Sequence, residues 1–258
     1  MNFDYGATRK SFEDIIFFYK QRKMNIGLFT TYYVYGQRLY LFDKIKMGEN
    51  YIDSAVALAD ELNLPKLRPI ANMALATKPK NVESDSAIYY YEKAMKDTAL
   101  LTSDRKSMLF SNMASTYMSK GYYKEAKKYT ENAILYYKNG GTKIDLINSA
   151  IDYEYLYACN IGLKDTAAAF KAILTAYNIV MDSLDGNGES TIFLRMGDYY
   201  YYKNMPDSAL FHYNEYDASV KALKQENAIV LPYIMKAMVY EKMGDFKNAK
   251  QLLEEARM

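Results

Sequence analysis

The chain has 258 residues, half of them apolar, and its 33 lysines and arginines nearly balance 31 aspartates and glutamates. That length and apolar content are sufficient to bury a sizeable core. The formal net charge of +2 provides no electrostatic basis for binding nucleic acid or an anionic membrane surface. We therefore expect no nucleic-acid partner.

The sequence also bears on the compartment. Cys159 is the single cysteine, so the chain has no disulfide framework and no thiolate metal site. Residues 1–23 carry early acidic side chains and only a short apolar run, which is unlike a secretory signal. No stretch approaches the roughly 20 apolar residues of a membrane span. We expect a cytoplasmic protein that does not insert into a membrane, with the periplasm as the alternative if a signal has been removed ahead of Met1.

Apolar residues recur at helical spacing along the chain. The pattern predicts a helix over residues 8–23, a connector over 25–29, and a long helix from residue 30 to about 47 that Gly48 ends. Asn50 with Asp53 resembles a capping box that opens the next helix. Pro79 breaks the helix that follows, and Ser84 caps the one after it. Later helices are expected over residues 108–120, 122–137, 143–161 and 165–181.

The clearest unit runs from Ser107 to Asn139, where two amphipathic helices flank Gly121. Its characteristic positions are Phe110, Met113, Ala114, Tyr117, Gly121, Ala126 and Ala133. The same spacing recurs at Phe193, Met196, Gly197, Tyr200, Asn204, Ala209 and Tyr216, and again at Tyr233, Lys236, Ala237, Tyr240, Gly244, Ala249 and Ala256. The alanines expected in the second helices recur at intervals mostly near 40 residues: Ala55, Ala87, Ala126, Ala167, Ala209 and Ala249.

This pattern resembles the tetratricopeptide repeat, in the long-repeat form of about 40 residues found in bacterial regulators. The resemblance implies an all-α fold, a right-handed α-solenoid (superhelix) of stacked antiparallel helix pairs. We predict an N-terminal helix and connector over residues 1–29. One continuous domain of repeats then follows, at about 30–63, 64–98, 104–139, 142–181, 190–224 and 227–258.

Enzymes need a constellation of reactive groups, and the sequence contains none that we recognise. His212 is the single histidine and lies between Phe211 and Tyr213, so we expect a structural or surface role for it. The acidic residues around 182–189 lack calcium-loop spacing, and no phosphate-binding glycine motif is present. Cys159 has no nearby base and is expected in the core or a groove. We predict no catalytic activity, no cofactor and no metal site.

In the family that the chain resembles, the first helices of the repeats line a concave groove. Transferring that geometry predicts a partner-binding groove formed by Met108, Ser111, Ser115, Met118, Leu194, Asp198, Tyr201, Tyr202, Leu231, Ile234 and Met238. The set is apolar, aromatic and hydroxylic, which suits an amphipathic helix or an extended apolar segment of a protein or peptide. It lacks the Lys/Arg/Asn cluster with which some relatives bind a C-terminal carboxylate.

Two functions fit this pattern. The first is a non-enzymatic scaffold that binds a protein or peptide in the groove, as the regulatory or sensory module of a larger bacterial protein. The alternative is a self-assembling structural repeat protein whose groove is filled internally or by a second copy. The last helix ends at Met258 without a polar capping helix, which favours either a longer protein or a homo-oligomer formed through that end.

Overall fold

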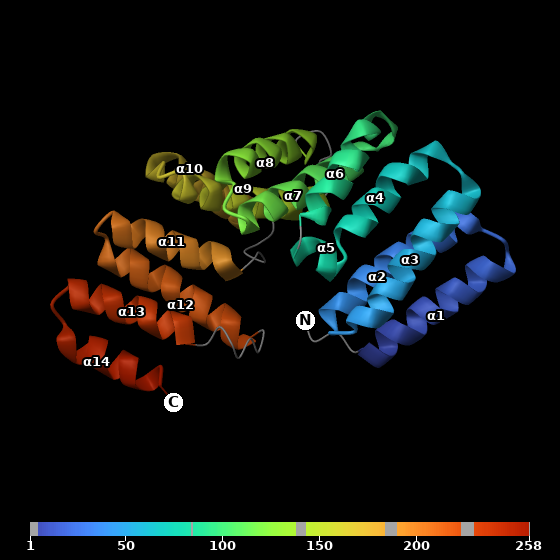
Figure 1. Cartoon of the computed structure of the whole chain (residues 1–258). Helices are drawn as coiled ribbons and strands as arrows, with labels where there is room; N and C mark the ends of the chain where they lie inside the picture. The colour runs from blue at the N-terminus through green and yellow to red at the C-terminus, as the bar shows by residue number, and fades with distance from the viewer. Residues whose placement is uncertain (1–4, 84, 138–142, 184–189, 223–229, 258) are drawn as a thin grey trace. The chain divides into compact units, whose positions relative to one another are not determined.

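Helices form nearly all of the protein in the computed structural model, which describes residues 5–83, 85–137, 143–183, 190–222 and 230–257 (Figure 1). Those residues contain fourteen α-helices and two short 3₁₀ helices, and no strand. The prediction of an all-α helical-repeat fold is confirmed. Backbone contacts divide the chain into an N-terminal unit, residues 2–136, and a C-terminal unit, residues 137–258. The expected division into one continuous domain with six repeats stays a prediction.

In the N-terminal unit, helices that follow one another pack side by side. They are α1 (Tyr5–Gln21), α2 (Asn25–Leu41), α3 (Ile45–Leu62), η1 (Pro65–Leu67), α4 (Arg68–Ala76), α5 (Pro79–Glu83), α6 (Ser86–Lys96), η2 (Thr98–Leu100), α7 (Ser103–Ser119) and α8 (Tyr123–Tyr137). One core cluster surrounds Phe29, Tyr33 and Ile52, and another surrounds Met73 and Met113. Each amphipathic helix thus buries its apolar stripe against its neighbours.

The C-terminal unit repeats this arrangement with six helices in the part that the structure describes. They are α9 (Lys143–Gly162), α10 (Thr166–Ser183), α11 (Ser190–Tyr202), α12 (Pro206–Ala222), α13 (Val230–Lys242) and α14 (Phe246–Glu255). Ile173 and Met196 lie in the core between α9, α10 and α11, while Tyr213 and Val239 lie in the core of the last pairs. The expected helices over 143–161 and 165–181 match α9 and α10 within two residues.

Most helix pairs are joined by one type of turn. A residue in the left-handed conformation follows the first helix, and the next residue donates its N–H to a carbonyl five positions earlier, as Tyr122 does to Tyr117 at 2.9 Å. This is the Schellman arrangement, which satisfies carbonyls at a helix C-terminus. The left-handed residues of these turns are Lys23, Asp43, Gly121, Lys164, Asn204 and Gly244, and Asn63 after α3 is left-handed as well. The prediction that the first helix of the central unit ends at Gly121 is therefore confirmed.

Two boundaries in the N-terminal unit were predicted wrongly. Residues 25–29 are not a connector, because the chain reverses at Lys23 and α2 begins at Asn25. Gly48 does not end a helix but lies inside α3, and Asn50 is therefore interior too. A Cβ placed on Gly48 would lie 2.8 Å from the backbone oxygen of Gly36, so these two glycines allow α2 and α3 to approach closely.

The register of α10 also differs from the prediction. Ala167 is exposed, and Ala169 is fully buried instead. Ala169 donates its backbone N–H to Asp165, just as Ala126 donates to Tyr122, so these two alanines are the equivalent positions. Both alanines lie five positions after the left-handed residue of the preceding turn, Gly121 or Lys164, so counting from that residue identifies the buried alanine correctly. The expected cap Ser84 lies outside the described residues, and Asp85 precedes α6.

Candidate functional site

Four of the predicted groove residues line one hollow in the C-terminal unit. Asp198, Tyr201 and Tyr202 come from α11 and Met238 comes from α13. The hollow measures about 410 Å³, and its lining consists of Tyr157, Ile161, Thr166, Phe170, Asp198, Tyr201, Tyr202, Tyr213, Met235 and Met238. We call it the aromatic hollow. Five of these ten residues carry an aromatic ring, and Asp198 is the one formally charged member of the lining.

The Asp198 carboxylate is held by two neighbours. Tyr213 donates its hydroxyl to Oδ1 at 2.9 Å, and Arg195 donates Nη1 to Oδ2 at a longer 3.3 Å. Burial and the adjacent carboxylate raise the pKa of the Tyr213 hydroxyl far above its ordinary value, so the phenol stays protonated and remains a donor. The Arg195 guanidinium also lies 5.6 Å from the ring centroid of Tyr157, a cation–π arrangement.

The rim of the hollow is more exposed. The ring of Tyr202 is 5.1 Å from that of Phe170 on α10, and Tyr202 is 63% exposed. Lys242 lies 4.5 Å from the ring centroid of Tyr201 and donates Nζ to the Tyr201 carbonyl at 2.9 Å. At the rim, the Tyr201 ring thus contacts a cationic group of the chain itself, and the Tyr202 side chain is largely exposed.

Sequence reasoning missed six of the ten lining residues. The residues that were not predicted are Tyr157, Ile161, Thr166, Phe170, Tyr213 and Met235. Thr166, Phe170 and Tyr213 lie on second helices, where no groove residue was expected, and Tyr157 and Ile161 lie on α9, from which none was taken. One signal was available: position 197 is glycine where the other two copies have Ala114 and Ala237. A smaller residue at a buried contact indicates that a large side chain lies opposite, and here that side chain is Tyr213.

Ile234 and Met238 line a second hollow, of about 480 Å³, between α13 and α14. We call it the terminal hollow, and its lining consists of Ile234, Ala237, Met238, Glu241, Phe246, Ala249, Lys250, Leu253, Glu254 and Arg257. Met238 belongs to both hollows, so they adjoin along α13. Together they form a surface on the C-terminal unit that is largely apolar and carries four charged side chains in the terminal hollow, Glu241, Lys250, Glu254 and Arg257.

Two predicted groove residues have a different location. Leu194 is 3% exposed and packs in the core with Phe193 and Tyr213, so it is not available to a partner. Leu231 is half-buried and packs against the same cluster. The helical offset that was carried over from the resembled family does not distinguish these core positions from the positions that line the hollow.

The other four predicted residues lie on α7 in the N-terminal unit. Met108 is partly exposed, and its sulfur accepts a weak hydrogen bond from the Tyr33 hydroxyl of α2 at 3.9 Å. Ser111, Ser115 and Met118 are half-buried on the same helix. These residues form a strip along α7, and α2 covers part of it through Tyr33.

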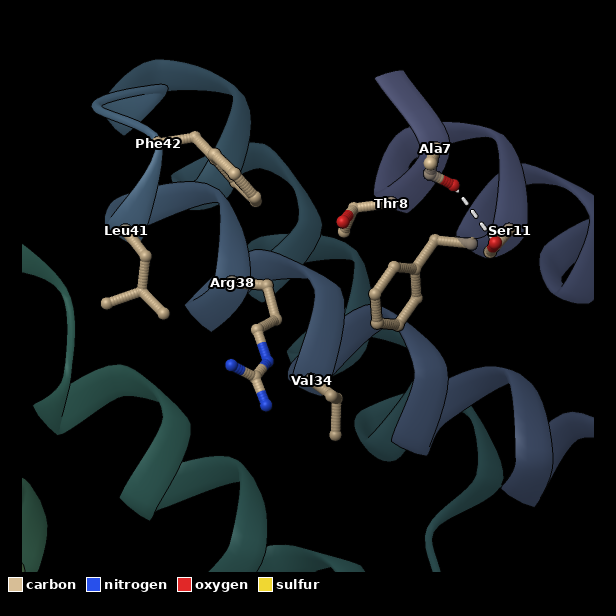
Figure 2. Close-up of a pocket in the computed structure, with 8 residues that line it drawn as sticks. Ala7, Thr8, Ser11, Val34, Arg38, Leu41 and Phe42 are labelled. Carbon is tan, nitrogen blue, oxygen red and sulfur yellow. Dashed lines mark hydrogen bonds between the residues drawn. The ribbon is translucent and has the colours of Figure 1, made fainter. Parts of the chain in front are cut away.

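A further hollow, of about 440 Å³, lies between α1 and α2 and contains none of the predicted residues. Its lining consists of Ala7, Thr8, Ser11, Phe12, Val34, Arg38, Leu41 and Phe42. Figure 2 shows the Arg38 guanidinium near Val34 and the Ser11 hydroxyl donating to the Ala7 carbonyl, at 2.9 Å. The repeat pattern did not cover α1, which is why the sequence did not indicate this hollow.

The two residues with potentially reactive side chains, His212 and Cys159, are buried in the packed interior. His212 is buried, with its ring stacked on that of Tyr200 at 5.1 Å and edge-on to Tyr177 at 5.4 Å, and burial lowers its pKa. Cys159 is fully buried, as predicted. Within the described ranges, no three His, Cys, Asp or Glu side chains meet in a way that could hold a metal ion. None of the helices described combines the length and apolar content needed to cross a bilayer.

Comparison with known proteins shows similarity at the level of the fold. No family model and no curated protein matches this chain. Among solved structures, apo RapI is similar with a TM-score of 0.73 and 12% identity, covering 98% of this chain and 73% of that one. Aspartyl phosphate phosphatase F from Bacillus subtilis is similar with a TM-score of 0.63 and 12% identity, over 99% of this chain and 75% of that one.

A third similar structure is a putative kinesin light chain from Podosopora anserina with nearly identical TPR-like repeats. Its TM-score is 0.50 at 12% identity, with 88% of this chain and 92% of that one covered. The repeated turn, the stacked helix pairs and these similarities agree. The chain therefore has the fold of the tetratricopeptide-type helical-repeat superfamily.

Proposed function

We propose that this chain is a non-enzymatic helical-repeat scaffold that binds a protein or peptide segment along α11 and α13 of its C-terminal unit. The observation that carries the proposal is the pair of adjoining hollows around Met238, lined largely by aromatic and aliphatic side chains. Clefts of this size with a few polar groups are typical binding sites, and adaptable Met and Tyr side chains suit an amphipathic helix or an extended apolar segment.

The non-enzymatic part of the proposal rests on the surroundings of the reactive groups. His212 is packed among aromatic rings, and Asp198 is engaged by Tyr213 and Arg195. One similar solved structure is named a phosphatase, but a likeness at 12% identity carries the fold alone. Within this proposal, the chain acts as the regulatory or sensory part of a larger bacterial protein.

A comparative capture experiment tests the proposal. The immobilised chain and a variant with Tyr201→Ser, Tyr202→Ser and Ile234→Ser are each exposed to a native cell lysate, and the retained proteins are quantified by mass spectrometry. A matched control carries Tyr89→Ser, Tyr122→Ser and Leu135→Ser, at well-exposed positions in the N-terminal unit. Partners of the groove should be lost from the first variant and kept by the control. If both variants retain the same proteins as the parent, the assignment of the groove is wrong.

Self-assembly is a second candidate function, favoured by the terminal hollow. Phe246 is 68% exposed at its edge and Leu253 is 47% exposed, which is much apolar surface for one short helix. Sedimentation equilibrium should then show association that strengthens with concentration and that Phe246→Ser with Leu253→Ser abolishes. Leu135→Ser serves as the control. A monomer at every concentration excludes this function.

A further inference from the structure

The aromatic hollow has the composition of a site for a cation. Its lining combines the rings of Tyr157, Phe170, Tyr202 and two other tyrosines with a single carboxylate, Asp198. The face of an aromatic ring is electron-rich and attracts ammonium and guanidinium groups, most strongly where water is partly excluded. A carboxylate beside such rings adds a charge-assisted hydrogen bond.

The Asp198 carboxylate is held in position by Tyr213, but one of its oxygens has only a long hydrogen bond. Tyr213 holds Oδ1 at 2.9 Å, whereas Arg195 reaches Oδ2 only at 3.3 Å, and the Asp198 side chain retains 24% exposure. A strong ion-pair contact is about 2.7–2.9 Å long, so the contact with Arg195 is a weak one. Oδ2 therefore has capacity for a better-placed donor.

The chain already places its own cations on rings of this lining. Arg195 lies over Tyr157 at 5.6 Å, and Lys242 lies over Tyr201 at 4.5 Å. These contacts indicate that guanidinium and ammonium groups are accommodated at the edge of the hollow. The rings of Phe170 and Tyr202, which contact each other at 5.1 Å, are placed to receive the methylenes of an incoming side chain.

We propose that the aromatic hollow takes the cationic side chain of an arginine or lysine from a bound peptide segment, which displaces Arg195 from Asp198 Oδ2. This inference rests on the proposed function, because it names the chemistry of the segment that the groove binds. The apolar surface of the terminal hollow then receives the residues that flank the cation. In the absence of a partner, Arg195 acts as an internal substitute for the ligand.

Three blocked peptides test the inference: acetyl-Leu-Arg-Leu-amide, acetyl-Leu-Lys-Leu-amide and the neutral acetyl-Leu-Gln-Leu-amide. The full chain is labelled with ¹³C at its methionine methyl groups, because Met235 and Met238 line the hollow and report occupancy directly. The arginine or the lysine peptide should saturate the shifts of these two signals at a concentration roughly tenfold below that of the glutamine peptide.

Variants with opposite expected effects make the test specific. Asp198→Asn should abolish the preference for the cationic peptides, and Arg195→Met should strengthen it by removing the internal competitor. Asp207→Asn, at an exposed carboxylate outside the lining, is the matched control and should leave the preference unchanged. Far-ultraviolet circular dichroism confirms that each variant keeps its helices.

Equal binding of all three peptides would overturn the cation site and leave the proposed groove standing. A preference that survives Asp198→Asn would also overturn it, as would cationic peptides that shift neither Met235 nor Met238. The capture experiment with the groove variants decides the proposed function separately, since it does not depend on charge at Asp198.

Discussion

The ring of Tyr213 occupies the space that a side chain at Gly197 would need. A Cβ placed on Gly197 would lie 2.3 Å from Tyr213 Cε1, well inside any permitted contact. The phenol passes over α11 at this point, and its hydroxyl reaches Asp198 on the same helix. The absence of a side chain at one position thus decides where a carboxylate is held in the aromatic hollow.

Gly197→Ala should destabilise the C-terminal unit by about 1–3 kcal/mol, the usual effect of overpacking a well-filled core. The ring of Tyr213 would have to move, which would weaken its hydrogen bond to Asp198. Urea denaturation of the single variants and of the double variant with Tyr213→Leu measures the coupling between the two positions. If the effects of the two substitutions simply add, Tyr213 is not the cause of the loss.

A substitution in one of the repeated turns should have the opposite effect and stabilise the protein. Lys164 adopts φ +62°, a left-handed conformation that is unfavourable for a residue with a Cβ. Lys164→Gly should therefore raise the free energy of unfolding, by up to about 1 kcal/mol, despite the greater freedom of glycine in the unfolded chain. Lys171→Gly, at an exposed position inside α10, is the control and should lower it by about 1 kcal/mol. Urea denaturation of both variants measures the two effects, and midpoints that shift in the same direction for Lys164→Gly and Lys171→Gly would refute this explanation.

His212 should make stability depend on pH. Burial lowers its pKa in the folded protein, whereas the unfolded chain binds a proton near the ordinary value of 6.5. The unfolded state therefore binds more protons as the pH falls through 6.5, so stability is present above that pH and is lost towards pH 5. His212→Phe should remove this dependence between pH 7.5 and 5, and carboxylates contribute little in that window. Urea denaturation across the range measures the slope, and equal slopes in the parent and the variant would contradict the prediction.

A buried ion pair links α12 to α13. Lys236 donates Nζ to Asp217 Oδ2 at 2.8 Å, and Lys221 lies 3.0 Å from Oδ1. Burial alone would raise the pKa of the Asp217 carboxyl, but the hydrogen bonds and charges of the two lysines outweigh it and hold the pKa below its ordinary value.

Lys236→Met should lower the free energy of unfolding by roughly 3 kcal/mol, because it leaves a buried carboxylate with one partner fewer. Lys250→Met breaks only an exposed ion pair with Glu254 and should change the free energy of unfolding by less than about 1 kcal/mol. Thermal unfolding of the two variants provides the comparison. Equal losses would mean that burial does not strengthen the Lys236–Asp217 pair.

The features that local chemistry controls could be predicted from the sequence. Helical periodicity around Phe110 and Met113 identified a buried stripe, and Gly121 marked a turn that needs a positive φ. Both depend on residues within a few positions of one another, so they are present in the sequence as spacing. The resemblance to the tetratricopeptide repeat followed from the same spacing.

The features that depend on distant residues could not be predicted. Gly48 was expected to end a helix because glycine favours helix ends, but its role is set by the close approach of Gly36 from another helix. Leu194 was assigned to the groove by its helical offset, but it packs in the core with Phe193 and Tyr213. Such packing depends on contacts between elements, and one sequence does not display them.

The sequence by itself determined that this chain forms stacked pairs of amphipathic helices. The tertiary structure alone decided that Tyr157, Phe170 and Tyr213, from three other helices, close around Asp198 to make a hollow. The physical reason is that periodicity reports which face of a helix is apolar, whereas a cavity depends on how closely several faces approach one another.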